Sequence, residues 1–207
     1  MTVTDIVALD NKRSKVFIDG EFAFILYRGE IRSYGIKTGE EISSPVFHEI
    51  TETLIPKRAK LRAMNLLQKR DYTERKLRDK LKEGMYSDDV IDEAIEYLKS
   101  YKYIDDERYA EDYIRYQMNL RSKNRIRQDL IQKGISTDLI DRLMNEAYET
   151  EENNPELALC VNLLRKKHYD PDTATYEDKQ KIMAFLYRKG FGNDVISRAL
   201  SLDTDII

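Results

Sequence analysis

The 207-residue sequence contains one cysteine, two histidines, no tryptophan, 8 glycines and 4 prolines. Scarce glycine and proline exclude a collagen-like or low-complexity chain, and a single cysteine excludes a scaffold held by internal disulfides. Because His48 and His168 are distant in the sequence and Cys160 is the single cysteine, no metal-ligand spacing is recognisable, so we expect no metal site, and we expect no cofactor. Such cysteine usage indicates a reducing compartment, so we expect a cytoplasmic protein.

Long apolar runs are also missing. The first twenty residues carry six charged side chains and lack the apolar core of a signal peptide, and no later run approaches the length of a membrane span. With 35 Lys+Arg against 38 Asp+Glu, the formal net charge is −3. This balance excludes a uniformly basic nucleic-acid binder but leaves a locally basic one open. Since neither a glycine-rich phosphate loop nor a nucleophile with a base partner is recognisable, we expect no catalytic residue and no enzymatic activity.

Strand patterns are confined to the N-terminal segment. Residues 3–9, 15–18 and 21–26 are rich in Val, Ile and Phe, and Asp19-Gly20 stands where a tight hairpin needs residues that tolerate positive φ. We predict a small antiparallel sheet within an N-terminal β-hairpin domain, residues 1–55. After a short helical turn closed by Gly35, Ser44-Pro45 is predicted to begin a helix, and everything beyond it reads as helix and short loop.

The remaining sequence repeats three times. Residues 77–81, 126–130 and 182–186 each place apolar side chains four apart on one helical face, and the apolar and acidic positions that follow recur in the same order. A further helix precedes each copy, at residues 59–69, 109–120 and 157–167. We therefore predict three-helix repeats at residues 56–104, 105–152 and 153–207, with Asn153-Asn154-Pro155 as a linker. The predicted fold class is mainly α, with tandem three-helix repeats that form an elongated curved arch and a small N-terminal sheet.

The turn between the second and third helix of each copy is the least regular element. Gly134 and Gly190 are predicted to supply left-handed C-caps in copies two and three. Met85 occupies the aligned position in copy one, with Gly84 before it, so this turn is expected to differ slightly.

Charge alternates in phase with the repeats, because the second helices are basic and the third helices acidic. Lys76, Arg125 and Lys181 share one repeat position, while Arg78 and Arg127 form a second aligned pair that Met183 breaks. This pattern predicts a discontinuous basic stripe suited to a phosphate backbone or an acidic protein groove, although a merely solvated face remains an alternative. The candidate contact residues are Lys76, Arg78, Arg121, Lys123, Arg125, Arg127, Lys179 and Lys181.

Tyrosines crowd the junction between repeats one and two. At helical spacing a tyrosine more often fills a core than stacks on a nucleic-acid base, so we favour core packing for this group. Its members are Tyr97, Tyr101, Tyr103, Tyr109, Tyr113 and Tyr116. Asp105-Asp106-Glu107 is predicted to form the cap and first turn of a helix, and Cys160 to be buried.

A distinctive order of residues runs through repeat two. Tyr103-Ile104-Asp105-Asp106-Glu107-Arg108-Tyr109-Ala110 is followed by Arg125-Ile126-Arg127-Gln128-Asp129-Leu130 and by Lys133-Gly134-Ile135. This order resembles the core signature of the bacterial RecX family of recombination regulators. The hairpin at residues 17–24 resembles the N-terminal segment of longer members, so the resemblance covers essentially the whole chain. One departure is Lys76, which stands where an acid commonly precedes the leucine and puts a local capping interaction in doubt.

The resemblance implies a non-enzymatic modulator that binds the RecA recombinase, chiefly its filament on single-stranded DNA, and restrains ATP hydrolysis and strand exchange. It implies a role in homologous recombination, DNA repair and the SOS response. We expect a monomer, and the elongated arch of three helical units predicts that it lies along the filament groove. Single- or double-stranded DNA is a further expected partner, and a membrane is not. Two alternatives stay open: a DNA-binding helical-repeat module that acts without the recombinase, and a helical scaffold for another partner.

Overall fold

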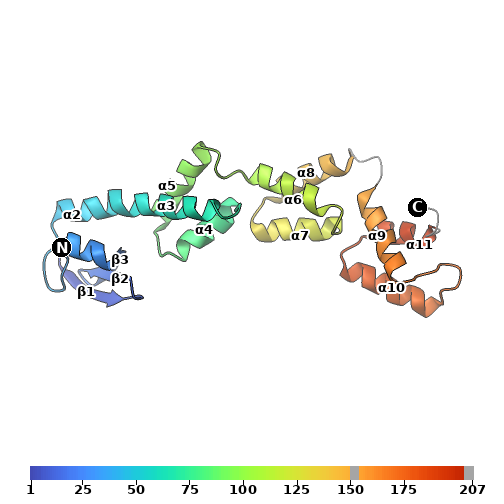
Figure 1. Ribbon diagram of the computed structural model, residues 1–207, viewed down its shortest axis with the longest axis horizontal. Helices are drawn as coiled ribbons and strands as arrows, with labels where there is room; N and C mark the ends of the chain where they lie inside the picture. Colours follow the sequence, from blue (N-terminus) through green and yellow to red (C-terminus); the bar gives the residue numbers. More distant parts are fainter. Residues whose placement is uncertain (150–153, 203–207) are drawn as a thin grey trace. The chain divides into compact units, whose positions relative to one another are not determined.

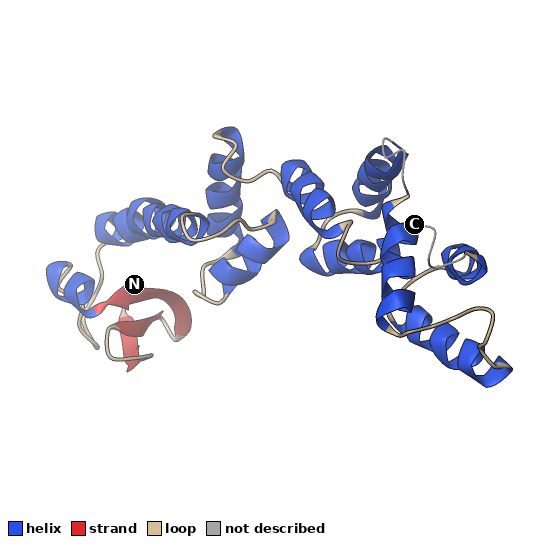
Figure 2. Cartoon of the chain, turned by 45° about the vertical axis from the view of Figure 1, so that its right-hand side comes forward, coloured by secondary structure: helices blue, strands red, loops and turns tan. Residues whose placement is uncertain are grey.

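The computed structural model describes residues 1–149 and 154–202. The chain divides into two compact units, Met1–Ile104 and Asp105–Ile207. Figures 1 and 2 show that strands occur only at the N-terminal end of the first unit, and that helices make up the rest of the described chain.

The N-terminal segment forms a three-stranded antiparallel sheet in the order β1 (Val3–Ala8), β2 (Arg13–Ile18) and β3 (Glu21–Tyr27). Asp19 and Gly20 both have positive φ in the β2–β3 turn, 50° and 90°, as the hairpin prediction requires. Alternate residues of β2 are buried, so one face of this strand packs against the core. The short helix α1 (Arg28–Ser33) follows β3 directly. The predicted sheet is confirmed.

A continuous helical segment links the sheet to repeat one, through α2 (Ser44–His48), the π-helical turn η1 (Glu49–Leu54) and α3 (Ile55–Leu67) (Figure 1). Its N-cap is Ser43 rather than the predicted Ser44, and Pro45 lies in its first turn. The predicted helix start at residue 59 was too late, because the chain continues helically through Pro56. The wider π turn ends at Leu54, two residues before this proline, whose ring would clash with a carbonyl in a regular α-helix.

Three helices form each of the predicted repeats. Repeat one contains α3 with α4 and α5, repeat two contains α6 to α8, and repeat three contains α9 to α11. Their bounds are α4 (Glu74–Lys82), α5 (Asp88–Ser100), α6 (Asp106–Gln117), α7 (Lys123–Lys133), α8 (Thr137–Glu149), α9 (Pro155–Lys166), α10 (Tyr176–Arg188) and α11 (Asn193–Ser201). The mainly helical fold class with a small sheet is therefore confirmed. The expected boundary at residues 152 and 153, and Asn153 of the expected linker, lie outside the described residues.

Helix starts follow the local sequence. Asp105 accepts a hydrogen bond from the backbone N–H of Arg108 at 3.0 Å, which confirms the predicted cap of α6. Thr73 caps α4 in the same way, through the N–H of Lys76 at 3.4 Å. The N-cap bond of α4 is thus present, whereas Lys76 at the third helical position carries no carboxylate with which to complete a capping box.

Each repeat has a hydrophobic cluster of its own, and the sheet has a fourth. The apolar residues spaced four apart on the second helices are all buried, as predicted: Leu77, Leu81, Ile126, Leu130, Ile182 and Leu186. Tyr86 and Val90 pack against both the sheet cluster and the cluster of repeat one. Apolar packing therefore continues from the sheet into the first repeat.

The turn after α4 adopts the conformation that glycine supplies elsewhere. Met85 has φ 59°, and the aligned Gly134 and Gly190 have φ 92° and 90°. The expectation of a different turn in copy one was wrong in this respect, because the left-handed conformation is retained and a non-glycine residue carries its strain.

Repeats two and three meet through buried polar groups at the start of α7. The Ser122 hydroxyl donates to the Lys189 carbonyl at 2.8 Å, and the Lys123 backbone N–H donates to the Glu156 carboxylate at 2.8 Å. Glu156 is buried, and this burial raises the pKa of its carboxyl although Lys123 opposes the shift. A carboxylate from α9 thus satisfies a free N–H at the N-terminus of α7.

The preference for core packing of the junction tyrosines was wrong for half of them. Tyr101, Tyr103 and Tyr116 are exposed, and the other three are half-buried. Aliphatic side chains such as Ile95 and Leu98 fill the core of repeat one, and Tyr97 is only partly buried against it. In the part of the chain that the structure describes, no helix combines the length and the apolar character that a membrane crossing needs.

The strained turn makes a prediction about stability. Met85→Gly should raise the free energy of unfolding by about 0.5–1 kcal/mol, because glycine adopts positive φ without the Cβ penalty. Met85→Ala keeps a Cβ and should give no such gain. Chemical denaturation of the three proteins checks this, and a Met85→Gly variant less stable than the wild type would contradict it.

The buried carboxylate makes a second prediction. Because the folded-state pKa of Glu156 is raised above 4.5, stability falls as the pH rises from 4.5 through that pKa. Glu156→Gln keeps an oxygen that accepts from Lys123 and removes the buried charge, so it should raise the thermal midpoint at neutral pH and lose this advantage below pH 4.5. Glu177→Gln, an exposed change on α10, is the control. A lowered midpoint at neutral pH would refute this account of Glu156.

Candidate partner-binding surface

The first aligned basic position is exposed in all three repeats. The exposed fractions of the Lys76, Arg125 and Lys181 side chains are 46%, 58% and 74%. Their nearest carboxylates, on Asp79, Asp129 and Glu177 respectively, are 3.8, 3.4 and 3.8 Å away, and each belongs to the same helix as the base. Contacts this long from exposed bases are weak, and the buried Asp129 is already paired more closely with Arg121, so the three charges are available to a partner.

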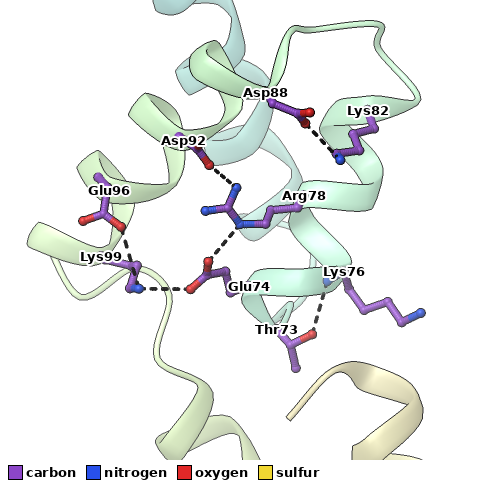
Figure 3. Close-up of polar contacts among 9 residues, drawn as sticks. All are labelled: Thr73, Glu74, Lys76, Arg78, Lys82, Asp88, Asp92, Glu96 and Lys99. Atoms are coloured by element: carbon purple, nitrogen blue, oxygen red, sulfur yellow. Dashed lines mark hydrogen bonds and ion pairs between the residues drawn. The ribbon is translucent and has the colours of Figure 1, made fainter. Parts of the chain in front are cut away.

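The second aligned basic position, occupied by Arg78 and Arg127, forms ion pairs within its own repeat. Arg78 on α4 donates from Nε to Glu74 at 2.8 Å and from Nη1 to Asp92 on α5. Figure 3 shows its guanidinium between these two carboxylates, with Lys76 pointing away from the cluster. The side chain of Arg78 is 29% exposed. Its interactions join the second helix of repeat one to the third.

Repeat two contains the same ionic cross-link, an arginine of the second helix paired with an aspartate of the third. Arg127 on α7 donates to Asp141 on α8 from Nε at 2.8 Å and from Nη2 at 3.0 Å. Such a two-point pairing is the geometry that a guanidinium and a carboxylate favour. The acids of the third helices therefore reach the basic second helices, and part of the alternating charge is neutralised within repeats one and two.

Repeat three has lost both partners of this cross-link. Met183 stands at the position of Arg78 and Arg127, and Ser197 stands at the position of Asp92 and Asp141. The simultaneous replacement of base and acid avoids an unpaired charge on either helix. The Met183 interruption seen in the sequence is thus explained by the helix pairing.

Glu74 extends the cross-link of repeat one. Burial disfavours the charge on its carboxyl, but hydrogen bonds from Arg78 and Lys99 outweigh burial and hold the pKa of Glu74 below its usual value. The Lys99 ammonium is 3.0 Å from Glu74 (Figure 3), so α5 reaches this carboxylate independently of Asp92. The stability that this pair contributes is present above the ordinary glutamate pKa of 4.5 and is lost as the pH falls through the lower folded-state value.

A buried aspartate organises the basic residues of repeat two. Asp129 accepts hydrogen bonds from Arg121 and from the Tyr113 hydroxyl, the latter at 3.1 Å. Burial and the neighbouring Asp129 raise the pKa of Tyr113 to about 12. Arg121 is consequently tied to its own repeat, whereas Arg125, 3.4 Å from the other carboxylate oxygen of Asp129, keeps most of its side chain in solvent.

The last two candidates differ in exposure. Lys123 is half-buried at the start of α7, with its ammonium 5.0 Å from the centre of the Tyr148 ring. Lys179 is exposed on α10. Contact of Lys123 or Lys179 with a partner stays a prediction, as does contact of the six basic residues described above.

The acidic partners of the aligned arginines were not predicted from the sequence. Asp92 and Asp141 lie at the same distance along the sequence from Arg78 and Arg127, and that shared spacing was the signal that could have found them. Cys160 is buried as predicted, and burial raises the pKa of its thiol to about 11. Within residues 1–149 and 154–202 no group of three or more His, Cys, Asp or Glu could hold a metal ion.

Models of known protein families match all three repeats in order. The first three-helix domain of RecX matches residues 59–98, the second matches residues 105–144, and the third matches residues 154–200. These segments together cover more than half of the 207 residues.

Curated relatives and solved structures agree with these models. The regulatory protein RecX of Caldanaerobacter subterraneus subsp. tengcongensis is 33% identical over 98% of this chain and 100% of its own length. That of Clostridium perfringens (strain 13 / Type A) is 36% identical over 88% of this chain and 85% of its own. A crystal structure of RecX from Lactobacillus salivarius is 26% identical, with a TM-score of 0.64 over 74% of this chain and 98% of its own. A second crystal structure, of a regulatory protein RecX, is similar in fold, with a TM-score of 0.64 and 24% identity over 96% of this chain and 98% of its own.

Loss of charge at the two aligned basic positions should change the stability of the protein by different amounts. Arg78→Met, which copies the residue of repeat three, should lower the free energy of unfolding by about 1 kcal/mol because Glu74 and Asp92 lose a shared partner. Lys76→Met on the same helix should change it by less than about 0.5 kcal/mol. Urea denaturation at low salt measures both values. Equal effects of the two substitutions would contradict the division of roles.

Proposed function

Because this chain belongs to the RecX family of regulatory proteins, we propose that it binds the RecA recombinase filament on single-stranded DNA and restrains the filament's ATP hydrolysis and strand exchange. The regulatory role follows from the family. The recombinase partner follows from what the family resemblance implies, and the charged surface of the repeats supports it.

One observation carries the proposed contact. Lys76, Arg125 and Lys181 occupy the same position of three successive repeats, and all three side chains are largely exposed. A repeated charge of this kind suits a partner that is itself repetitive, such as a filament with an acidic groove or a nucleic-acid backbone. Arg78 and Arg127 support this surface by fixing the second helix of their repeats against the third.

The mechanism rests on linkage between weak contacts. Once one repeat is bound, the next repeat meets its own site at a high effective concentration, so three weak contacts give a tight complex. A protein bound to successive protomers resists the rearrangements that ATP turnover and strand exchange require. Restraint is therefore expected at less than one molecule per recombinase.

The test is the single-stranded-DNA-dependent ATPase of the cognate recombinase, titrated with the wild type and with a triple variant, Lys76→Gln, Arg125→Gln and Lys181→Gln. The wild type should inhibit at substoichiometric amounts. The triple variant should need at least about tenfold more protein, since each lost charge weakens a multivalent contact. The matched control replaces three exposed bases outside the candidate set, Lys57→Gln, Arg115→Gln and Arg188→Gln, and should inhibit like the wild type.

Two results would overturn the proposal. No effect of the wild type on turnover at any ratio would remove the recombinase as the partner. Full inhibition by a folded triple variant would remove the aligned bases as the contact.

A further inference from the structure

A pocket in the first unit is not part of the surface described above. It has a volume of about 570 Å³ and lies among β3, the η1–α3 segment and the turn between α4 and α5. This volume is in the range of pockets that hold small organic groups. The sheet cluster and the cluster of repeat one meet beside it at Tyr86 and Val90, so both sides of the pocket belong to one unit.

The charge on the pocket wall has a single sign. Its charged lining residues are Arg13, Arg58, Arg62 and Lys82, and no carboxylate lines it. The acidic partners of these bases, Asp10, Glu30 and Asp88, lie outside the wall. The wall therefore favours an anionic group.

One of these cations has unused hydrogen-bonding capacity. The Arg62 Nε is buried and has no hydrogen-bond partner among the described residues, and its Nη2 reaches only the Lys80 carbonyl at 3.4 Å. A buried donor without a partner costs free energy, so Arg62 is the least satisfied of the four cations, and a small shift of its side chain toward the pocket would let a ligand accept this hydrogen bond. Arg58 differs, because it already donates to Glu30 and to the Ile25 carbonyl of β3.

The rim of the pocket is apolar and largely aromatic. Phe22, Tyr27 and Met85 line it and are exposed. Proteins bind single-stranded nucleic acids with exposed aromatic rings beside cations. A nucleobase stacks on a ring, and the phosphate of the same nucleotide pairs with a lysine or arginine side chain.

The turn after α4 contributes residues with constrained conformations to the pocket wall. Met85 accepts a strained positive φ where the other repeats use glycine, and its side chain lines the pocket. A Cβ on Gly84 would lie 2.7 Å from a ring carbon of Tyr86, so only glycine lets that ring take its place in the wall. Strain that persists at a pocket is typical of a functional segment.

We propose that this pocket binds one nucleotide of single-stranded nucleic acid, with the phosphate held by the arginine and lysine side chains and the base stacked on the aromatic rim. A peptide added as a strand along β3 fits less well, because Arg58 already occupies the Ile25 carbonyl at the free edge of that strand. This nucleotide site uses none of the aligned lysine and arginine residues and needs no recombinase. Its test is therefore independent of the proposed function.

The absence of tryptophan gives a direct test. Phe22→Trp places the only tryptophan of this 207-residue chain on the rim, and its fluorescence is titrated with oligothymidine in the absence of recombinase. Stacking should quench the emission saturably, and the affinity should fall with salt. Tyr116→Trp, on the exposed surface of α6, is the matched reporter and should not respond in the same concentration range.

Variants in the Phe22→Trp background separate binding from folding. Arg62→Met and Met85→Gly should each weaken the affinity for oligothymidine at least about fivefold. Met85→Gly is decisive, because it is expected to fold at least as stably as the parent. Lys57→Gln removes an exposed charge from α3 outside the pocket and should leave the affinity unchanged.

The proposal is overturned by an unresponsive tryptophan at position 22, or by an affinity that Arg62→Met and Met85→Gly leave unchanged. It is also overturned if polyglutamate quenches this tryptophan at lower concentrations than oligothymidine does. That result would identify an acidic peptide as the occupant.

Discussion

In repeats one and two, an arginine on the second helix is joined to an aspartate on the third. Arg78 and Asp92, like Arg127 and Asp141, hold two helices whose apolar faces already pack against each other. Because the arginine follows the exposed base by two positions, the cross-link also fixes the direction in which that base points. A helix with many positive charges is thereby divided into a face that maintains the repeat and a face that meets solvent.

This division changes how the alternating charge of the chain is understood. Basic second helices and acidic third helices suggest two separate electrostatic surfaces, yet many of these charges satisfy each other within a repeat. Repeat three, with Met183 and Ser197 in place of the pair, shows that the cross-link can be removed as a unit while the exposed base, Lys181, is retained. The position that persists in all three repeats is the one that makes no strong contact inside the protein.

The sequence was sufficient for the fold class, the three-helix repeats and the buried faces, because apolar periodicity and helix caps are local signals. It was insufficient for the junction tyrosines, since whether a ring enters a core depends on the aliphatic side chains that already fill it. The long helix through Pro56 was missed because a π turn before a proline cannot be read from propensity. The pocket beside β3 was beyond reach, since its wall joins residues from positions 13 to 90 that only the fold assembles. Among the candidate bases, the sequence identified the positions but not which carboxylate each one meets.

The central claim is that the first aligned position meets a partner and the second maintains the repeat. Its most direct test is a cysteine footprint on the recombinase filament, with Lys76→Cys, Arg125→Cys and Lys181→Cys made one at a time and Glu96→Cys on the exposed side of α5 as the reference. The native Cys160 is buried, so it contributes little background reactivity. The account predicts that the filament slows alkylation at all three aligned positions and leaves position 96 unaffected. Undiminished alkylation at positions 76, 125 and 181 in a filament-bound protein would contradict it.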